Sequence, residues 1–174
     1  MTCGVPWGLP GSAARSRVRA GKAHVIEGIE VAVDREAVVV TAREPLTVLS
    51  SAFVRGGLTA ARAIVNLHVP KDLREDQADA LLPRFTVRRA IPGPWVGLLT
   101  SAWTERAEVA HLRDRGLSAM AMVTVGLSNR VAAGTTPIAA WAPSTINAIV
   151  VVDGAAVPAA PVNARMTVTR VKAG

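Results

Sequence analysis

The stretch HVIEGIEVAVDREAVVVTA, residues 24–42, decides the class of fold. Its first part, 24–33, partly alternates apolar and polar side chains, and residues 37–42 form a Val-rich run. Because β-branched side chains pack well on a pleated surface, both parts predict strands. The charged residues 34–36 between them predict the turn of a hairpin. Antiparallel β-structure therefore opens the organised part of the chain.

The rest of the chain mixes strand and helix patterns. Val-, Leu- and Ile-rich runs predict strands, whereas apolar residues at helical spacing among charges predict helices. The strand over 146–152 is expected to be central in a sheet. This order is not regular enough for a doubly wound parallel sheet, so we predict a single-domain α/β (α+β) fold: a mixed β-sheet with helices packed on it. The further predicted strands cover 46–50, 61–69, 95–100, 117–125 and 146–152, and the predicted helices cover 74–82, 104–114 and 159–172.

Length and composition suit one domain with a real core, because the chain has 174 residues and half of them are hydrophobic. Residues 1–22 hold several Gly and Pro and then an Arg-rich cluster. We expect them to be a disordered basic N-terminal extension, and 23–174 to be the domain.

Charge and cysteine content set the expected partners. The 20 basic and 13 acidic residues give a formal charge of +7, which raises a nucleic-acid hypothesis. Beyond the N-terminal cluster the basic residues are scattered among acids, so we expect no nucleic-acid partner. Cys3 is the single cysteine, which fits a reducing compartment. No apolar run spans a bilayer and no signal-peptide order is present, so we expect a cytoplasmic protein without a membrane partner.

Standard catalytic signatures are missing from the sequence. It contains no GxGxxG, no GxxxxGK[ST], no HExxH and no GxSxG pattern. His24, His68 and His111 lie far apart and show no metal-ligand spacing. We therefore expect neither a metal nor a cofactor.

Small polar residues instead gather at the ends of the predicted strands. Ser50 and Ser51 close one strand, Thr100 closes another, and Asn147 opens the strand that Asp153 closes. Strand ends of an open sheet often meet at a ligand crevice. The alternative is that these residues cap turns, for which Ser, Thr, Asn and Asp are favoured.

The order and spacing of several segments resemble the adenosylcobinamide amidohydrolase family over roughly residues 25–172. The resemblance implies a salvage enzyme that cleaves the amide joining the aminopropanol arm to the corrin ring of adenosylcobinamide. The products would be adenosylcobyric acid and aminopropanol. The segments that carry the resemblance are 49–52 with Gly56-Gly57, 65–72, 96–102, 124–129, 145–153 and 162–164.

Amide hydrolysis needs an activated nucleophile, donors for the developing oxyanion and a proton for the leaving amine. Asp153, Ser128 and Asn129 are the expected catalytic residues. Asp153 would activate water, a role that Asp72 could also fill, and Ser128 or Thr145 would be an alternative covalent nucleophile. The loop around Asn129 would supply donors. A corrinoid substrate needs apolar surface and hydrogen-bonding groups. The expected substrate-binding residues are Ser50, Ser51, Gly57, Asn66, Thr100, Thr124, Gly126, Thr145, Asn147 and Asn163.

Departures from the family pattern leave alternatives open. Val125 stands where the family has Ala, Ser144 where it often has Gly, and Arg170 where it typically has Glu. The chain ends at Gly174 where relatives continue, so the domain is expected to be C-terminally truncated. A non-catalytic corrinoid-binding relative is the first alternative, and a basic nucleic-acid-binding domain is the second. The sequence does not specify the oligomeric state. Packing of Trp103 or Trp141 on the macrocycle and cobalt ligation by His68 also remain open.

Overall fold

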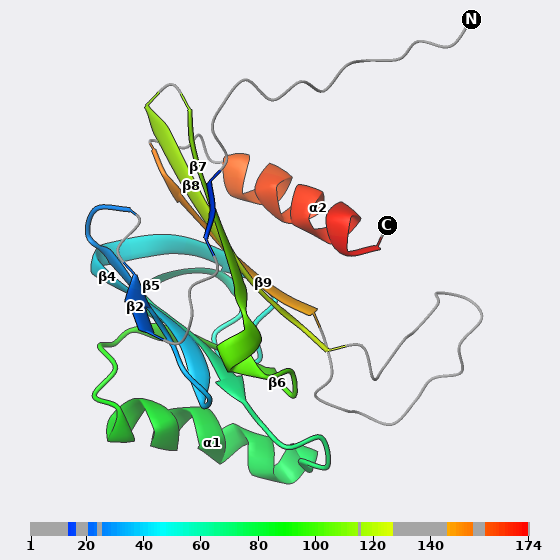
Figure 1. Cartoon of the computed structure of the whole chain (residues 1–174). Coiled ribbons are helices and arrows are strands. Elements are labelled where there is room, and N and C mark those ends of the chain that lie inside the picture. The colour runs from blue at the N-terminus through cyan, green and yellow to red at the C-terminus, as the bar shows by residue number, and fades with distance from the viewer. Residues whose placement is uncertain are drawn as a thin grey trace, which may run out of the picture.

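The computed structural model describes residues 14–16, 21–23, 26–114, 116–126, 146–154 and 159–173. Figure 1 shows their elements in chain order. These are β1 (Ala14–Ser16), β2 (Gly21–Ala23), β3 (Ile29–Val33), β4 (Ala37–Ser50), β5 (Gly57–His68), α1 (Glu75–Arg88), β6 (Trp95–Thr100), the 3-10 turn η1 (Thr104–Arg106), β7 (Glu108–Asp114), β8 (Leu117–Val125), β9 (Ile146–Asp153) and α2 (Ala160–Ala173).

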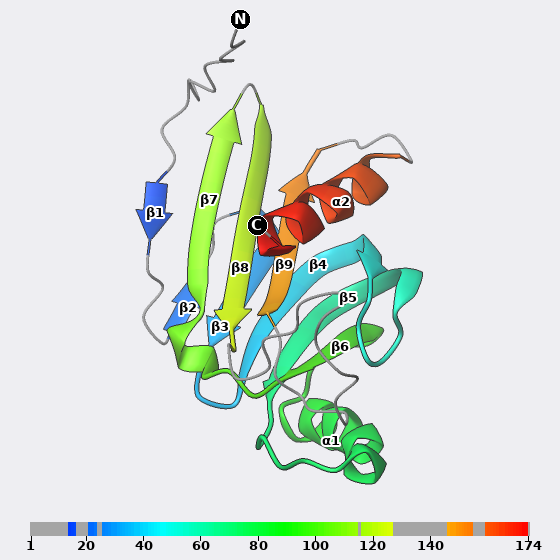
Figure 2. The ribbon, with the colours of Figure 1, turned by 90° about the vertical axis from the view of Figure 1, so that its right-hand side faces the viewer.

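The strands form two sheets in the described part of the chain. A five-stranded sheet has the order β2-β3-β4-β5-β6, and a four-stranded sheet has the order β1-β7-β8-β9. β5 and β6 run parallel, while the other neighbours are antiparallel. The single-domain α+β fold and its mixed sheet are thus confirmed, with a second, antiparallel sheet that the sequence did not predict (Figures 1 and 2).

Two apolar layers hold the sheets and α1 together. In β3, Ile29, Val31 and Val33 are buried at every second position, and they pack in one cluster with Met120 and Met122 of β8. The core between the two sheets therefore follows from strand alternation. On the other face of the five-stranded sheet, residues of β4, β5 and β6 pack against α1. α2 lies away from α1, beside β9, and contacts β4 (Figures 1 and 2).

The hairpin predicted over 24–42 is confirmed, although its first strand begins at Ile29, and its turn is built by Asp34. The Asp34 carboxylate accepts hydrogen bonds from the backbone N–H groups of Glu36 (2.8 Å) and Ala37 (3.0 Å). It also pairs with Arg89 at the end of α1, while Arg88 donates to Glu36 at 2.7 Å. Burial by itself would raise the pKa of Asp34, but the two N–H groups and the Arg89 guanidinium outweigh it and hold the pKa below its ordinary value.

The predicted helix over 104–114 is wrong. The chain makes the short turn η1 and then the strand β7, which pairs along its whole length with β8. Ala107, Val109, Ala110 and Leu112 fit a helical stripe in sequence, but Gly116 lets the chain turn with a φ of +82° so that the segment returns as a hairpin arm. The short segment is compatible with both a helical and a strand period of apolar residues, and pairing with β8 selects the strand.

Other boundaries also differ from the predictions. The helix expected over 74–82 continues through Pro83 to Arg88, because Leu82 and Phe85 are buried beneath the sheet. Burial of two such side chains contributes roughly 3–6 kcal/mol, which offsets the roughly 3 kcal/mol cost of an interior proline. The strand expected over 46–50 is the second half of β4, which is irregular between Thr41 and Leu46.

Two strand positions also differ. β9 was expected to be central in its sheet, but in the described residues it is an edge strand that pairs with β8 alone. β1 and the first two residues of β2 belong to segment 1–22, which we expected to be a disordered extension; β1 pairs with β7 and β2 pairs with β3, in different sheets. In the described residues, no helix has both the length and the apolar character needed to cross a membrane.

Candidate functional site

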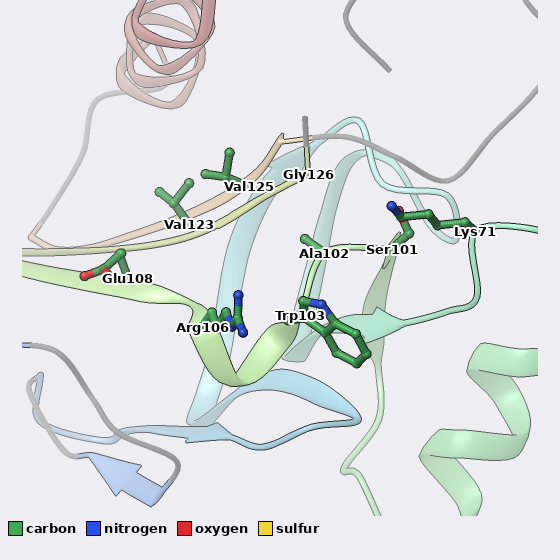
Figure 3. Close-up of a pocket in the computed structure, with 9 residues that line it drawn as sticks. All are labelled: Lys71, Ser101, Ala102, Trp103, Arg106, Glu108, Val123, Val125 and Gly126. Atoms are coloured by element: carbon green, nitrogen blue, oxygen red, sulfur yellow. The ribbon is translucent and has the colours of Figure 1, made fainter. Parts of the chain in front are cut away.

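A cavity of about 400 Å³ lies where β5, β6 and β8 end (Figure 3). The parallel strands β5 and β6 pair His68 with Thr100 at their carboxyl ends, and Val69 N–H donates to the Thr100 carbonyl at 2.8 Å. The paired region of β5 and β6 ends at this point, and the carboxyl ends of parallel strands are where ligand crevices form. The cavity is lined by Lys71, Ser101, Ala102, Trp103, Arg106, Glu108, Val123, Val125 and Gly126.

Ser101 gives this cavity an unpartnered hydroxyl. The residue is 7% exposed, and its Oγ atom has no hydrogen-bond partner among the described residues. A buried hydroxyl without a partner costs about 1–3 kcal/mol, so native proteins rarely keep one without a use. In Figure 3 the Lys71 side chain extends from its loop toward Ser101. The wall of the cavity therefore combines a free hydroxyl with a nearby cation.

His68 and Trp103 form a second feature of this edge. Their rings stack with centroids 5.0 Å apart and an interplanar angle of 21°. The His68 Nδ1 atom lies 2.9 Å from the carbonyl oxygen of Ala102. Trp103 is still 56% exposed, so one part of the indole covers His68 while another part remains open to solvent.

Behind the cavity, Asn66, Thr124 and Asn147 form a buried chain of hydrogen bonds between the two sheets. Asn147 Nδ2 donates to the Leu99 carbonyl at 2.9 Å and to Asn66 Oδ1 at 2.8 Å, and Asn66 Nδ2 donates to Thr124 Oγ1 at 2.9 Å. Because a carbonyl only accepts, Leu99 fixes the orientation of the Asn147 amide, which in turn fixes that of Asn66. The structure brings together three predicted substrate-binding residues, but their side chains bind one another and the Leu99 backbone carbonyl.

The other predicted substrate-binding residues are dispersed. Gly126 lines the cavity. Thr100 is fully buried directly before the lining residue Ser101, and its hydroxyl accepts a hydrogen bond from Ala102 N–H at 3.1 Å. Ser50 caps its own turn by accepting from Ala52 N–H at 2.9 Å. Ser51 directly follows β4, Gly57 begins β5 at the end away from the cavity, and Asn163 is exposed on α2.

Of the three predicted catalytic residues, the described part of the chain contains Asp153. Ser128 and Asn129, like the predicted binding residue Thr145, lie outside the described residues. Asp153 pairs with Ser118 at the far end of β9, whereas Asn147 pairs with Thr124 at the cavity end. Six strand positions span roughly 20 Å. Asp153 therefore lies away from this cavity, at the opposite end of β9 from Asn147, because an extended strand keeps its ends apart.

Sequence reasoning missed several residues of the cavity. Lys71, Ser101 and Ala102 belong to segments 65–72 and 96–102 that carried the family resemblance, so their position after two strands was an available signal. Arg106 and Glu108 were hidden by the wrong helix prediction. In the described ranges, no group of three or more His, Cys, Asp and Glu side chains is arranged to hold a metal ion.

Comparison with known proteins gives one result. The family model described as adenosylcobinamide amidohydrolase matches residues 22–174. Searches of curated proteins and of solved structures found no match. The matched range contains every strand from β3 to β9, both helices and all residues that line the cavity. The chain therefore belongs to the adenosylcobinamide amidohydrolase family.

Proposed function

We propose that the protein hydrolyses the aminopropanol amide of adenosylcobinamide, giving adenosylcobyric acid and aminopropanol in corrinoid salvage. The observation that carries this proposal is the match of the family model to residues 22–174. The cavity at the ends of β5, β6 and β8 supports it, because it offers a free hydroxyl and cations beside apolar surface.

The size of the cavity suggests which part of the substrate it takes. Pockets of roughly 300–1,000 Å³ bury a drug-sized ligand, and an adenosylated corrinoid is much larger. A cavity of about 400 Å³ suits the aminopropanol arm with its amide, so the macrocycle would remain outside. The exposed part of Trp103 and the exposed Val125 provide apolar surface at the rim on which the macrocycle can pack.

In this arrangement Ser101 would donate its hydroxyl hydrogen bond to the oxygen of the scissile carbonyl. That oxygen becomes negative in the tetrahedral intermediate, and donors held in place for it lower the barrier. Lys71 and Arg106 border the same space, so their positive charge favours the oxyanion and the carboxylate product.

The direct test incubates the purified protein with adenosylcobinamide and follows adenosylcobyric acid and aminopropanol by mass spectrometry. Formation of both products supports the proposal. Tight corrinoid binding without turnover would instead identify a non-catalytic relative. The absence of both binding and turnover would overturn the proposal. Ser101→Ala should lower kcat about 100-fold or more. Thr47→Ala, which removes an exposed hydroxyl from β4, is the matched control and should leave kcat unchanged.

A further inference from the structure

We propose that His68 is the general base of this site, acting through its Nε2 atom on the water that attacks the amide. The inference rests on the proposed amidohydrolase function and deepens it by assigning the proton acceptor that the sequence did not identify. It stands on three observations: the hydrogen bond at Nδ1, the stack with Trp103, and the place of His68 at the end of β5.

The hydrogen bond at Nδ1 sets the tautomer of the ring. The partner of Nδ1 is the Ala102 carbonyl oxygen, at 2.9 Å, and a carbonyl oxygen can only accept. Nδ1 must therefore carry the hydrogen, and in the neutral imidazole the lone pair lies on Nε2. The hydrogen bond of His68 within the described residues is made through Nδ1, so Nε2 is available as a proton acceptor.

The ring of His68 lies against the wall of the cavity, in contact with two lining residues, although His68 is not itself one of them. His68 shares with Asn66 the face of β5 that turns toward the four-stranded sheet, since successive side chains of a strand alternate between faces. Its two side-chain contacts, Ala102 and Trp103, both line the cavity, and Ser101 precedes them in the chain. A macrocycle packed on Trp103 would therefore shield His68 from bulk water as the arm enters.

The reaction then balances with water as the only co-reactant. The water oxygen bonds to the amide carbon while Nε2 takes a proton from that water, and the carbonyl π electrons move to oxygen. The carbonyl re-forms as the carbon–nitrogen bond breaks, and the proton on Nε2 passes to the leaving aminopropanol nitrogen. The products are a carboxylic acid and an amine, and His68 returns to its neutral state.

Charged residues of both signs lie on the segments around His68. Glu36 accepts the His68 backbone N–H through its carbonyl at 2.7 Å, and Lys71 follows β5. Glu105 and Arg106 belong to η1, which contacts β5. A change in the pH profile must therefore be traced to His68 by substitution rather than read from the wild type alone.

Two amide substitutions separate the roles of the two ring nitrogens. In His68→Asn the amide nitrogen can replace Nδ1 and keep the bond to Ala102, while nothing replaces Nε2. In His68→Gln the amide group reaches the position of Nε2 but is not basic. Both should lower kcat by about 100-fold or more, because general-base catalysis contributes about 10²–10⁴-fold. The Kd for adenosylcobinamide should change less than threefold, and the residual activity should lose the acid limb of the wild-type pH profile of kcat/KM.

The control is His111→Asn on β7. His111 does not line the cavity, and its Nε2 atom is buried without a hydrogen-bond partner in the described part of the chain. It should leave kcat and the pH profile unchanged. If the wild type turns over and either His68 variant keeps more than a tenth of its kcat, the assignment of His68 is overturned while the amidohydrolase function stands. If the wild type shows no turnover, both proposals fail. A ¹⁵N–¹H spectrum of the protein without substrate should show His68 as the Nδ1–H tautomer, and an Nε2–H tautomer would overturn the assignment independently of activity.

Discussion

Replacing Asn147 by Asp exchanges one NH₂ group for an oxygen of nearly the same size. Asn147 Nδ2 donates to the Leu99 carbonyl at 2.9 Å and to Asn66 Oδ1 at 2.8 Å. In the variant at neutral pH a carboxylate oxygen would face two acceptors. The substitution therefore tests whether the chain of amides between the two sheets stabilises the fold, without changing the packing volume.

The expected loss of stability follows from these two contacts. Each buried acceptor left without its donor costs about 1–3 kcal/mol, so the sum is about 2–6 kcal/mol. Asn147 is half-buried, so water relieves part of this cost, and we expect a loss of about 3 kcal/mol. For a chain of this size that corresponds to a fall in Tm of roughly 6–12 °C.

Urea denaturation at pH 7 followed by circular dichroism measures this loss. Asn163→Asp makes the same chemical change at an exposed position of α2 and should alter the free energy of unfolding by less than about 0.5 kcal/mol. The neighbouring acceptors disfavour the charged carboxyl and raise its pKa. The deficit of Asn147→Asp is therefore fully present above that raised pKa and shrinks as the pH falls. A loss below about 1 kcal/mol at pH 7 would refute the assigned hydrogen bonds.

Three further predictions concern the core, the hairpin and the rim of the cavity. Gly97→Ala places a Cβ atom 2.6 Å from Leu82 Cδ1, so it should destabilise by about 1–3 kcal/mol, and combining it with Leu82→Ala should cost less than the sum of the single losses in a double-mutant cycle by urea denaturation. The folded-state pKa of Asp34 is lowered from 3.8, so the stability that its carboxylate contributes is present above pH 3.8 and is lost as the pH falls through the folded-state pKa. Asp34→Asn should therefore flatten the fall of Tm at acid pH. An unchanged fall of Tm would contradict the pairing with Arg89. Trp103→Ala should raise the Kd for adenosylcobinamide about tenfold in a fluorescence titration, whereas Trp103→Phe should raise it less than threefold; equal effects would argue against packing of the macrocycle on this side chain.

The candidate site was predictable only in part, and particular residues show why. Asn66, Thr124 and Asn147 were expected near one another, and they are, because each lies near a strand end at the same edge of the two sheets. Their predicted role depended on which atoms their amides would bind, and sequence carries no information on that. Ser101 lies in segment 96–102, which carried the resemblance, but it was not predicted to be a site residue, since a serine after a strand is common and its lack of a hydrogen-bond partner exists only in three dimensions.

Local sequence by itself determined most strands, the hairpin at Asp34 and the class of the fold, because alternation, β-branching and turn residues act over a few positions. The order and spacing of segments along the chain were also sufficient to predict the family. Tertiary structure alone decided that residues 108–114 are a strand, that a second sheet covers the first, and that Asp153 lies away from the cavity. These features depend on which strands pair and on how the two sheets pack, and such contacts override local preferences whenever two local structures are close in free energy.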